Sequence, residues 1–133
     1  MIRALLLILL PQTAVAIPPE PPRGASPLAI VVRSVRGETR IPVRHDPLSG
    51  PAIPAPAFLA AVGGGFTFDA GWAAVTVGEQ QFRLLLGAAL YEAGGVLRPL
   101  VGGAVLRRDT LLLPLQFVSE ALPRALGGRF KWD

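Results

Sequence analysis

The chain of 133 residues contains no cysteine and a single histidine. Without cysteine it forms no disulfide, carries no thiolate nucleophile and offers no attachment point for a lipoprotein anchor. The one histidine, His45, does not supply the two or three imidazoles of a copper site or the ligand set of a catalytic zinc site. We therefore expect no catalytic residues, no metal ligands and no cofactor, and interpret His45 as a solvated loop residue.

Residues for catalysis without a metal are also sparse. His45 is the only histidine that could act as a general base for a nucleophile. The four serines lie in no nucleophile motif: Ser26, Ser34, Ser49 and Ser119. A pair of carboxylates could cleave a glycosidic bond, and Glu120 is the most notable acid because it falls within a predicted helix. We interpret Glu120 as an exposed helical side chain, and Asp69 and Asp133 as turn residues. The sequence thus predicts that this chain is not itself an enzyme.

Acidic residues number nine against 13 lysines and arginines, which gives a net charge of +4. The arginines are scattered, and Arg107-Arg108 is the only adjacent pair. Nucleic-acid binding favours a clustered basic stripe with interleaved aromatic residues, so we expect no nucleic-acid partner. A weak attraction to anionic wall polymers or lipid head groups stays open.

Residues 1–16 have the three-part layout of a secretory signal peptide. A positively charged start precedes an apolar run at residues 4–10, and residues 14–16 are small where a signal peptidase would cleave. The apolar run is too short to span a bilayer, which takes about 20 helical residues. We predict cleavage after Ala16, export to the periplasm or cell envelope, and no stable membrane span thereafter.

Residues 17–27 contain five prolines and predict an extended linker. The single domain that follows, residues 28–133, is predicted to have an α+β fold, with short antiparallel strands packed on one or two helices. Helices are predicted at residues 56–62, ended by Gly63-Gly64-Gly65, and at residues 115–122, interrupted at Pro123. Residues 45–51 read as a loop. Strands are predicted between the glycine turns: residues 28–36, 39–44, 66–68, 72–77, 81–86, 88–92, 96–100 and 104–106.

An internal repeat relates residues of about 50–77 to residues 110–133. Each copy has an apolar residue and proline, a helix, glycines, and an aromatic strand that ends in aspartate, Asp69 in one copy and Asp133 in the other. The first copy continues into a further strand, whereas the second stops at Asp133. We therefore expect that the C-terminal strand of the domain is missing and that the domain is truncated.

The second copy reads Leu113-Pro114-Leu115-Gln116-Phe117-Val118-Ser119-Glu120-Ala121-Leu122, then Gly127-Gly128, then Phe130-Lys131-Trp132-Asp133. This phrase resembles the copper amine oxidase N-terminal-domain-like module, and the resemblance covers roughly residues 50–133. The first copy matches the frame but lacks the leucine and the glutamate that follow the proline. The resemblance implies an α+β accessory domain of exported bacterial proteins that binds no copper.

A signal peptide followed by this module is similar to the front of exported N-acetylmuramoyl-L-alanine amidases, whose zinc hydrolase domain comes after it. The resemblance therefore implies a non-catalytic accessory module that positions or restrains a peptidoglycan hydrolase through protein or wall contacts. The alternative is a stand-alone periplasmic or cell-surface domain that recognises wall glycan or an envelope protein through an exposed sheet edge.

Two tryptophans, Trp72 and Trp132, would be able to stack on sugar rings in a wall-binding module. Both alternate with phenylalanines in predicted strands. Because aromatic residues in such positions are more often buried, we favour the interpretation of both tryptophans as core residues, and the sequence leaves open the alternative that they are exposed.

Overall fold

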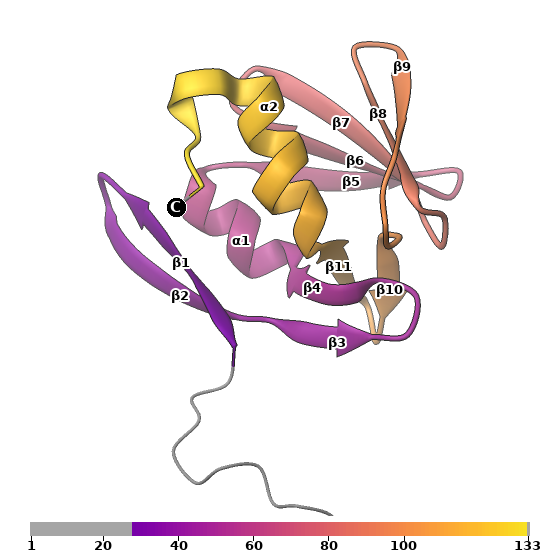
Figure 1. The fold of residues 1–133 in the computed structure, drawn as a ribbon, viewed down its shortest axis with the longest axis horizontal. Coiled ribbons are helices and arrows are strands. Elements are labelled where there is room, and N and C mark those ends of the chain that lie inside the picture. The colour runs from indigo at the N-terminus through magenta and orange to yellow at the C-terminus, as the bar shows by residue number, and fades with distance from the viewer. Residues whose placement is uncertain (1–27, 133) are drawn as a thin grey trace, which may run out of the picture.

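The computed structural model describes residues 28–132, which fold into three antiparallel sheets around two helical segments (Figure 1). The predicted signal peptide, the linker and Asp133 lie outside the described residues. The described strands are β1 (Ala29–Ser34), β2 (Gly37–Pro42), β3 (Arg44–Asp46), β4 (Gly50–Pro54), β5 (Gly65–Asp69), β6 (Trp72–Val77), β7 (Gln80–Leu85), β8 (Leu90–Ala93), β9 (Val96–Pro99), β10 (Val105–Arg107) and β11 (Thr110–Pro114). The helices lie between the β1–β2 hairpin and the sheet that contains β5 to β9.

The β1–β2 hairpin forms a two-stranded sheet of its own. Ile30 on β1 lies directly opposite Ile41 on β2, and both side chains are buried in the main core. Their neighbours on the other face of the hairpin, such as Val31 and Arg40, are exposed. The hairpin is therefore attached to the domain by one apolar face, as expected where successive side chains alternate between the two faces of a strand.

The largest sheet is a five-stranded meander in the order β5-β6-β7-β8-β9. On β6, Ala73, Val75 and Val77 are buried in alternation with more exposed residues, and β7 follows the same pattern. The β5–β6 turn is formed by Ala70 and Gly71, which both have positive φ angles, 46° and 83°. A two-residue turn of this kind matches the twist of the strands that it joins. The local sequence therefore specifies this sheet strand by strand.

The four-stranded sheet has the order β10-β11-β4-β3 and joins distant parts of the chain. Its central pair is antiparallel, with Ile53 on β4 directly opposite Leu113 on β11. These two residues occupy corresponding positions of the predicted repeat, and each is followed by a proline, Pro54 or Pro114, and then by a helix. The pairing places the two copies side by side, so that both helices begin at the same small sheet.

The first helix, α1 (Ala55–Val62), buries Phe58 and Leu59 in the core. It ends at Gly63, which has the left-handed φ angle of 74°, and the N–H of Gly64 donates to the carbonyl of Leu59. Glycine favours this conformation because it has no Cβ. The three glycines thus end the helix and lead into β5, as the sequence indicates. No helix in the described part of the chain is both long and apolar enough to cross a membrane.

The second helical segment differs from its prediction at Pro123. A proline in a regular helix lacks an N–H group and collides with the carbonyl four residues earlier. Here a π-helical turn, η1 (Phe117–Ala121), precedes α2 (Leu122–Leu126), and Pro123 stands in the first turn of α2. The N–H of Leu122 donates to Phe117, five residues back. The predicted interruption is therefore wrong, because the π turn accommodates the proline and the segment continues. A short 3-10 turn, η2 (Gly127–Arg129), follows.

One main hydrophobic core connects the hairpin, both helical segments and the sheets. Phe117 of η1 makes edge-to-face contacts with Phe82 at a centroid distance of 5.4 Å and with Tyr91 at 5.7 Å. On the other helix, Phe58 contacts Phe130 edge to face at 6.2 Å. Such aromatic pairs add stabilisation beyond the area that they bury. Each helix therefore contributes one phenylalanine that anchors it in the core.

The predicted α+β class is wrong, because the domain is nearer to an all-β fold. Strand makes up 51% of the described residues and helix 21%, and the α-helix α1 has only eight residues. The difference arises partly at residues 45–51, which were expected to form a loop and instead contribute to β3 and β4. A tight turn after Asp46 allows both flanking segments to pair, although they contain two prolines.

We predict that Phe58→Ala lowers the free energy of unfolding by about 3–5 kcal/mol, because it removes a fully buried ring and leaves a cavity. The matched control is Phe68→Ala, since Phe68 is a half-exposed phenylalanine on β5, and its loss should cost about 1 kcal/mol or less. Urea unfolding followed by circular dichroism measures both values. Equal losses in the two variants would contradict the core described here.

Candidate functional site

The turn between β3 and β4 is built around the carboxylate of Asp46. Its Oδ1 atom accepts hydrogen bonds from the backbone N–H of Leu48 at 2.8 Å and of Ser49 at 3.1 Å. An aspartate that binds the backbone two and three residues ahead closes the chain into a turn. In this turn Pro47 and Leu48 are exposed and Ser49 is buried.

The same carboxylate joins the two edge strands of the four-stranded sheet. Arg107 on β10 donates from Nε to Oδ2 of Asp46 at 2.6 Å and from its terminal nitrogen to Oδ1 at 3.3 Å. The hydrogen bond from Arg107 is the main reason that the pKa of Asp46 is lowered from 3.8 to about 2, and the amides of Leu48 and Ser49 add to it. Burial acts in the opposite direction but is outweighed. Asp46 is therefore ionised at neutral pH and fixes the turn against β10.

Residues 101–103 pack against this turn from the other side. The N–H of Gly103 donates to the carbonyl of Leu48 at 3.3 Å, and Gly102 lies so close to Ser49 that a Cβ atom would overlap the Ser49 carbonyl. Val101 is held by its N–H, which donates to Oε1 of Gln116 at 2.7 Å. The two loops are thus fixed to each other and to the start of the second helical segment.

These loops and the helical segment enclose a groove of about 480 Å³. We call it the turn–helix groove, and its lining residues are Pro47, Leu48, Ser49, Gly50, Pro51, Val101, Gly102, Pro114, Leu115, Gln116, Ser119 and Glu120. Two apolar side chains in this lining are strongly exposed, Leu48 at 56% and Val101 at 89%. The Oγ atom of Ser49 is buried and has no hydrogen-bond partner among the described residues. Exposed apolar side chains that gather in a hollow of the surface are typical of binding sites.

The helix side of the groove is the π-helical turn. Glu120 is exposed, and Gln116 donates from Nε2 to its Oε2 at 3.2 Å. Gln116 therefore holds Val101 with its oxygen and Glu120 with its nitrogen. Because π-helical turns occur often at functional sites, the position of η1 in this groove is a second indication of a site.

The structure brings together three residues that the sequence singled out separately, Ser49, Ser119 and Glu120. Glu120 is exposed, as predicted. His45 is exposed too, but it lies on β3 opposite Pro51 instead of in a loop. The other predicted polar residues lie apart: Ser34 and Asp69 are exposed at the ends of β1 and β5, and Ser26 and Asp133 lie outside the described residues.

The interpretation of both tryptophans as core residues is wrong. Trp132 is 42% exposed, and Trp72 is only partly buried. The guanidinium of Arg83 lies over the Trp72 ring, 4.6 Å from its centroid, and Arg83 also faces Glu92 at 3.7 Å. Alternation in a strand indicates which residues share a face, but it does not show which face is covered.

The sequence did not identify Leu48, Val101 or Gln116 as members of a site. Leu48 and Val101 are isolated apolar residues in loops, and only the turn signal of Asp46-Pro47 marks this part of the chain. In residues 28–132, no three His, Cys, Asp or Glu side chains are grouped so that they could hold a metal ion. Comparison of the chain with protein-family models, with curated proteins and with solved structures found no match.

We predict that Asp46→Asn lowers the melting temperature at neutral pH but matters little at low pH. The pKa of Asp46 is lower in the folded protein than the ordinary 3.8, so its ionised form stabilises the fold above that value. This contribution is lost as the pH falls towards about 2. The melting temperatures of the two proteins should therefore converge over this range, whereas a pH-independent difference would refute the role of the charge. Asp69→Asn, at an exposed site, is the control.

We predict that Gly102→Ala destabilises the protein by about 1–3 kcal/mol, since its new methyl group would overlap the Ser49 carbonyl. Gly65→Ala serves as the control, because no atom lies within 4 Å of the position of its Cβ. Chemical denaturation would compare the two variants. If both were equally stable, the two loops would not be in close contact.

Proposed function

We propose that this chain is a non-catalytic accessory module of an exported cell-envelope protein, and that it holds a polypeptide segment in the turn–helix groove. The observation that supports this best is the fixed arrangement of the groove. Asp46 fixes one wall through its bonds to Leu48 and Ser49, and Gln116 fixes another through its bond to Val101. A site that is already ordered loses little conformational entropy when it binds.

The lining of the groove suits an apolar side chain next to a hydrogen-bonding group. Leu48 and Val101 would exchange water for apolar contact with the bound segment. The Glu120 carboxylate favours a donor or a cationic group in the ligand.

The resemblance of residues 50–133 to the copper amine oxidase N-terminal-domain-like module suggests the setting of this role. We propose that the module belongs to an N-acetylmuramoyl-L-alanine amidase and positions its zinc hydrolase domain on peptidoglycan. The bound segment would then come from that hydrolase domain or from the linker that leads to it. Glu120 and Gln116, which contribute to the groove, both lie in the phrase that carries the resemblance.

The first test is to read the coding region beyond the codon for Asp133. An in-frame continuation with metal-ligating histidines and glutamates would support the amidase, and a stop codon within a few residues would refute it. In the second case, the module would act as a stand-alone binding or scaffold protein. Its groove would then be tested against purified envelope proteins.

In the amidase, we predict that Val101→Asp lowers the rate of peptidoglycan hydrolysis about fivefold or more, since it places a charge in the apolar contact. Leu97→Asp is the control, because Leu97 is also a strongly exposed apolar residue but lies on β9 outside the groove. Release of dye from labelled peptidoglycan measures the rate. Equal rates for the two variants would exclude a role of the groove in positioning the hydrolase domain.

A further inference from the structure

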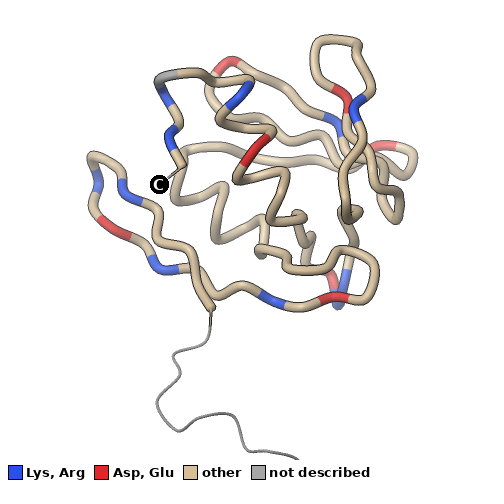
Figure 2. The backbone as a smooth tube through the Cα atoms, in the orientation of Figure 1, with Lys and Arg blue, Asp and Glu red and all other residues tan. Residues whose placement is uncertain are grey.

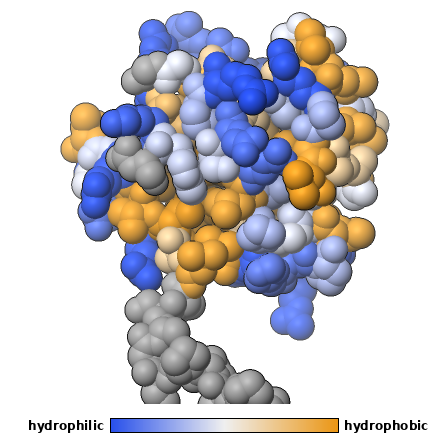
Figure 3. Space-filling view, viewed as in Figure 1, coloured by the Kyte–Doolittle hydropathy of each residue, from blue (hydrophilic) through white to orange (hydrophobic). Residues whose placement is uncertain are grey.

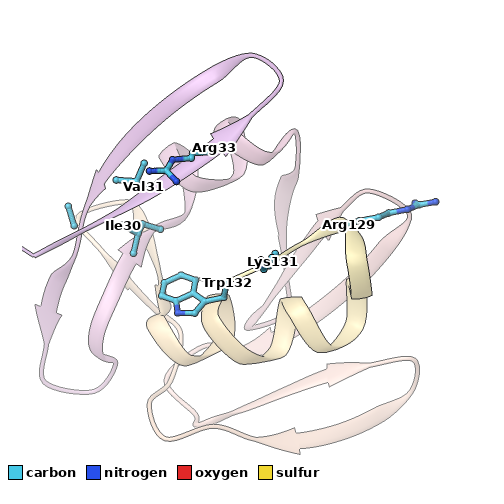
Figure 4. Close-up of a pocket in the computed structure, with 7 residues that line it drawn as sticks. Ile30, Val31, Arg33, Arg129, Lys131 and Trp132 are labelled. Carbon is cyan, nitrogen blue, oxygen red and sulfur yellow. The ribbon is translucent and has the colours of Figure 1, made fainter.

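A second cleft lies between strand β1 and the C-terminal segment of the described chain. It has a volume of about 550 Å³, and its lining includes Val31 and Arg33 from β1 and Arg129, Lys131 and Trp132 from the other side. Figure 4 shows the Trp132 ring directed back towards β1, with Arg33 on the opposite wall. We call this the basic cleft.

Positive charge gathers around the basic cleft. Five basic residues of the described chain lie in the β1–β2 hairpin or in the C-terminal segment: Arg33, Arg36, Arg40, Arg129 and Lys131. Among the described residues of these two parts, Glu38 is the one acidic residue. Figure 2 shows Lys and Arg along the hairpin and in the C-terminal segment, and Figure 3 shows hydrophilic and apolar residues side by side on this side of the molecule. The remaining charges of residues 28–132 are balanced. The excess positive charge of the domain is thus concentrated on one side.

Cross-strand pairing brings a further base to the same face as the cleft. Arg40 lies directly opposite Val31, and side chains that face each other across two strands share one face of the sheet. Glu38 lies opposite Arg33 and forms an ion pair with it at 3.1 Å. Both side chains of this pair are largely exposed. An exposed ion pair is weak, so Arg33 can turn to an anionic ligand at little cost.

A second cavity neighbours the basic cleft and shares two arginines with it. Arg33 and Arg129 also line the adjoining cavity of about 610 Å³, which continues past Phe130 to the β6–β7 turn. Glu79 is the acidic residue of that lining. A small anion would need only a single compact pocket. Two neighbouring cavities that share basic residues instead suit an extended chain with repeated negative charges.

We propose that the basic cleft binds an acidic polysaccharide. Arg33, Arg129 and Lys131 would pair with carboxylate or phosphate groups along the polymer, and Trp132 would stack on a sugar ring. Trp132 is 42% exposed and points into the cleft, which leaves part of the ring accessible to a ligand. An aromatic ring offers an apolar face to the C–H groups of a sugar, while the arginines bind its acidic groups.

A nucleic acid is the other polyanion that fits the charge. Sequence-tolerant binding of single strands uses several aromatic rings on which successive bases stack. Trp132 is the one aromatic side chain in the lining of the basic cleft, and Phe130, which lines the adjoining cavity, packs against Phe58 of the core. Trp132 is therefore the one exposed ring of these linings that is available for stacking. The lining therefore favours a polymer with repeated negative charges of which only one unit stacks on an aromatic ring. This inference is independent of the function proposed for the turn–helix groove, because the two linings share no residue.

Titration of the purified chain with polygalacturonate, followed by tryptophan fluorescence and by calorimetry, tests the proposal, with neutral dextran and a thymidine oligonucleotide as comparisons. We expect binding to polygalacturonate that weakens with salt and no binding to dextran. The double variant Arg33→Gln/Arg129→Gln should bind at least about tenfold more weakly. Its control is Arg98→Gln/Arg124→Gln, which removes the same charge from exposed arginines outside the cleft and should change the Kd less than about twofold.

Trp132→Ala separates stacking from charge, and its exposed side chain can be removed without loss of the core. It should weaken binding about fivefold and leave the slope of log Kd against log salt unchanged, whereas the arginine variant should lower that slope by about two. Thermal unfolding of each variant checks that it is folded. Equal losses in the two arginine double variants would overturn the proposal, because the attraction would then be unspecific. Tighter binding of the oligonucleotide would overturn it in favour of a nucleic acid.

Discussion

The antiparallel pairing of β4 with β11 is the constraint on which the rest of the domain depends. Ile53 and Leu113 lie opposite each other, and the chain leaves each strand through a proline and enters a helix. The position of the strand pair therefore decides where α1 and η1 start. Those helices carry Phe58 and Phe117, whose rings reach Phe130 on one side and the five-stranded sheet on the other. The closing of a long loop between β4 and β11 costs entropy, which the shared core offsets.

A second constraint acts at the edges of the same sheet, where one carboxylate serves two purposes. Asp46 closes the β3–β4 turn through the backbone, and it binds Arg107 of β10 through its side chain. A partly buried ion pair of this kind stabilises the fold only if the remaining lone pairs of the carboxylate are also hydrogen-bonded. The backbone N–H groups of Leu48 and Ser49 supply these hydrogen bonds. The turn–helix groove depends on this arrangement, because Leu48 and Ser49 lie within the turn. Its geometry is therefore coupled to the ionisation of Asp46.

The two proposed binding surfaces differ in physical character. The turn–helix groove has apolar side chains on fixed loops and would gain affinity from burial and from low ordering entropy. The basic cleft has arginines and a lysine around one exposed ring, and would gain affinity from charge and lose it in salt. The first surface is suited to a polypeptide and the second to an acidic glycan. A module with both could hold an envelope protein and a wall polymer together.

The sequence by itself determined the local elements. The glycine turns and the alternation of apolar residues identified most strands of the five-stranded sheet, and Gly63 to Gly65 marked the end of α1, because turns and helix ends depend on neighbouring residues. Only the tertiary structure decided the fold class, the course of the helix through Pro123 and the exposure of Trp132. It also decided the groove, since Ser49, Val101 and Glu120 are far apart in the chain. Local sequence patterns show which residues of a strand or helix share a face. Contacts between distant segments decide which face is buried and which other elements lie beside it.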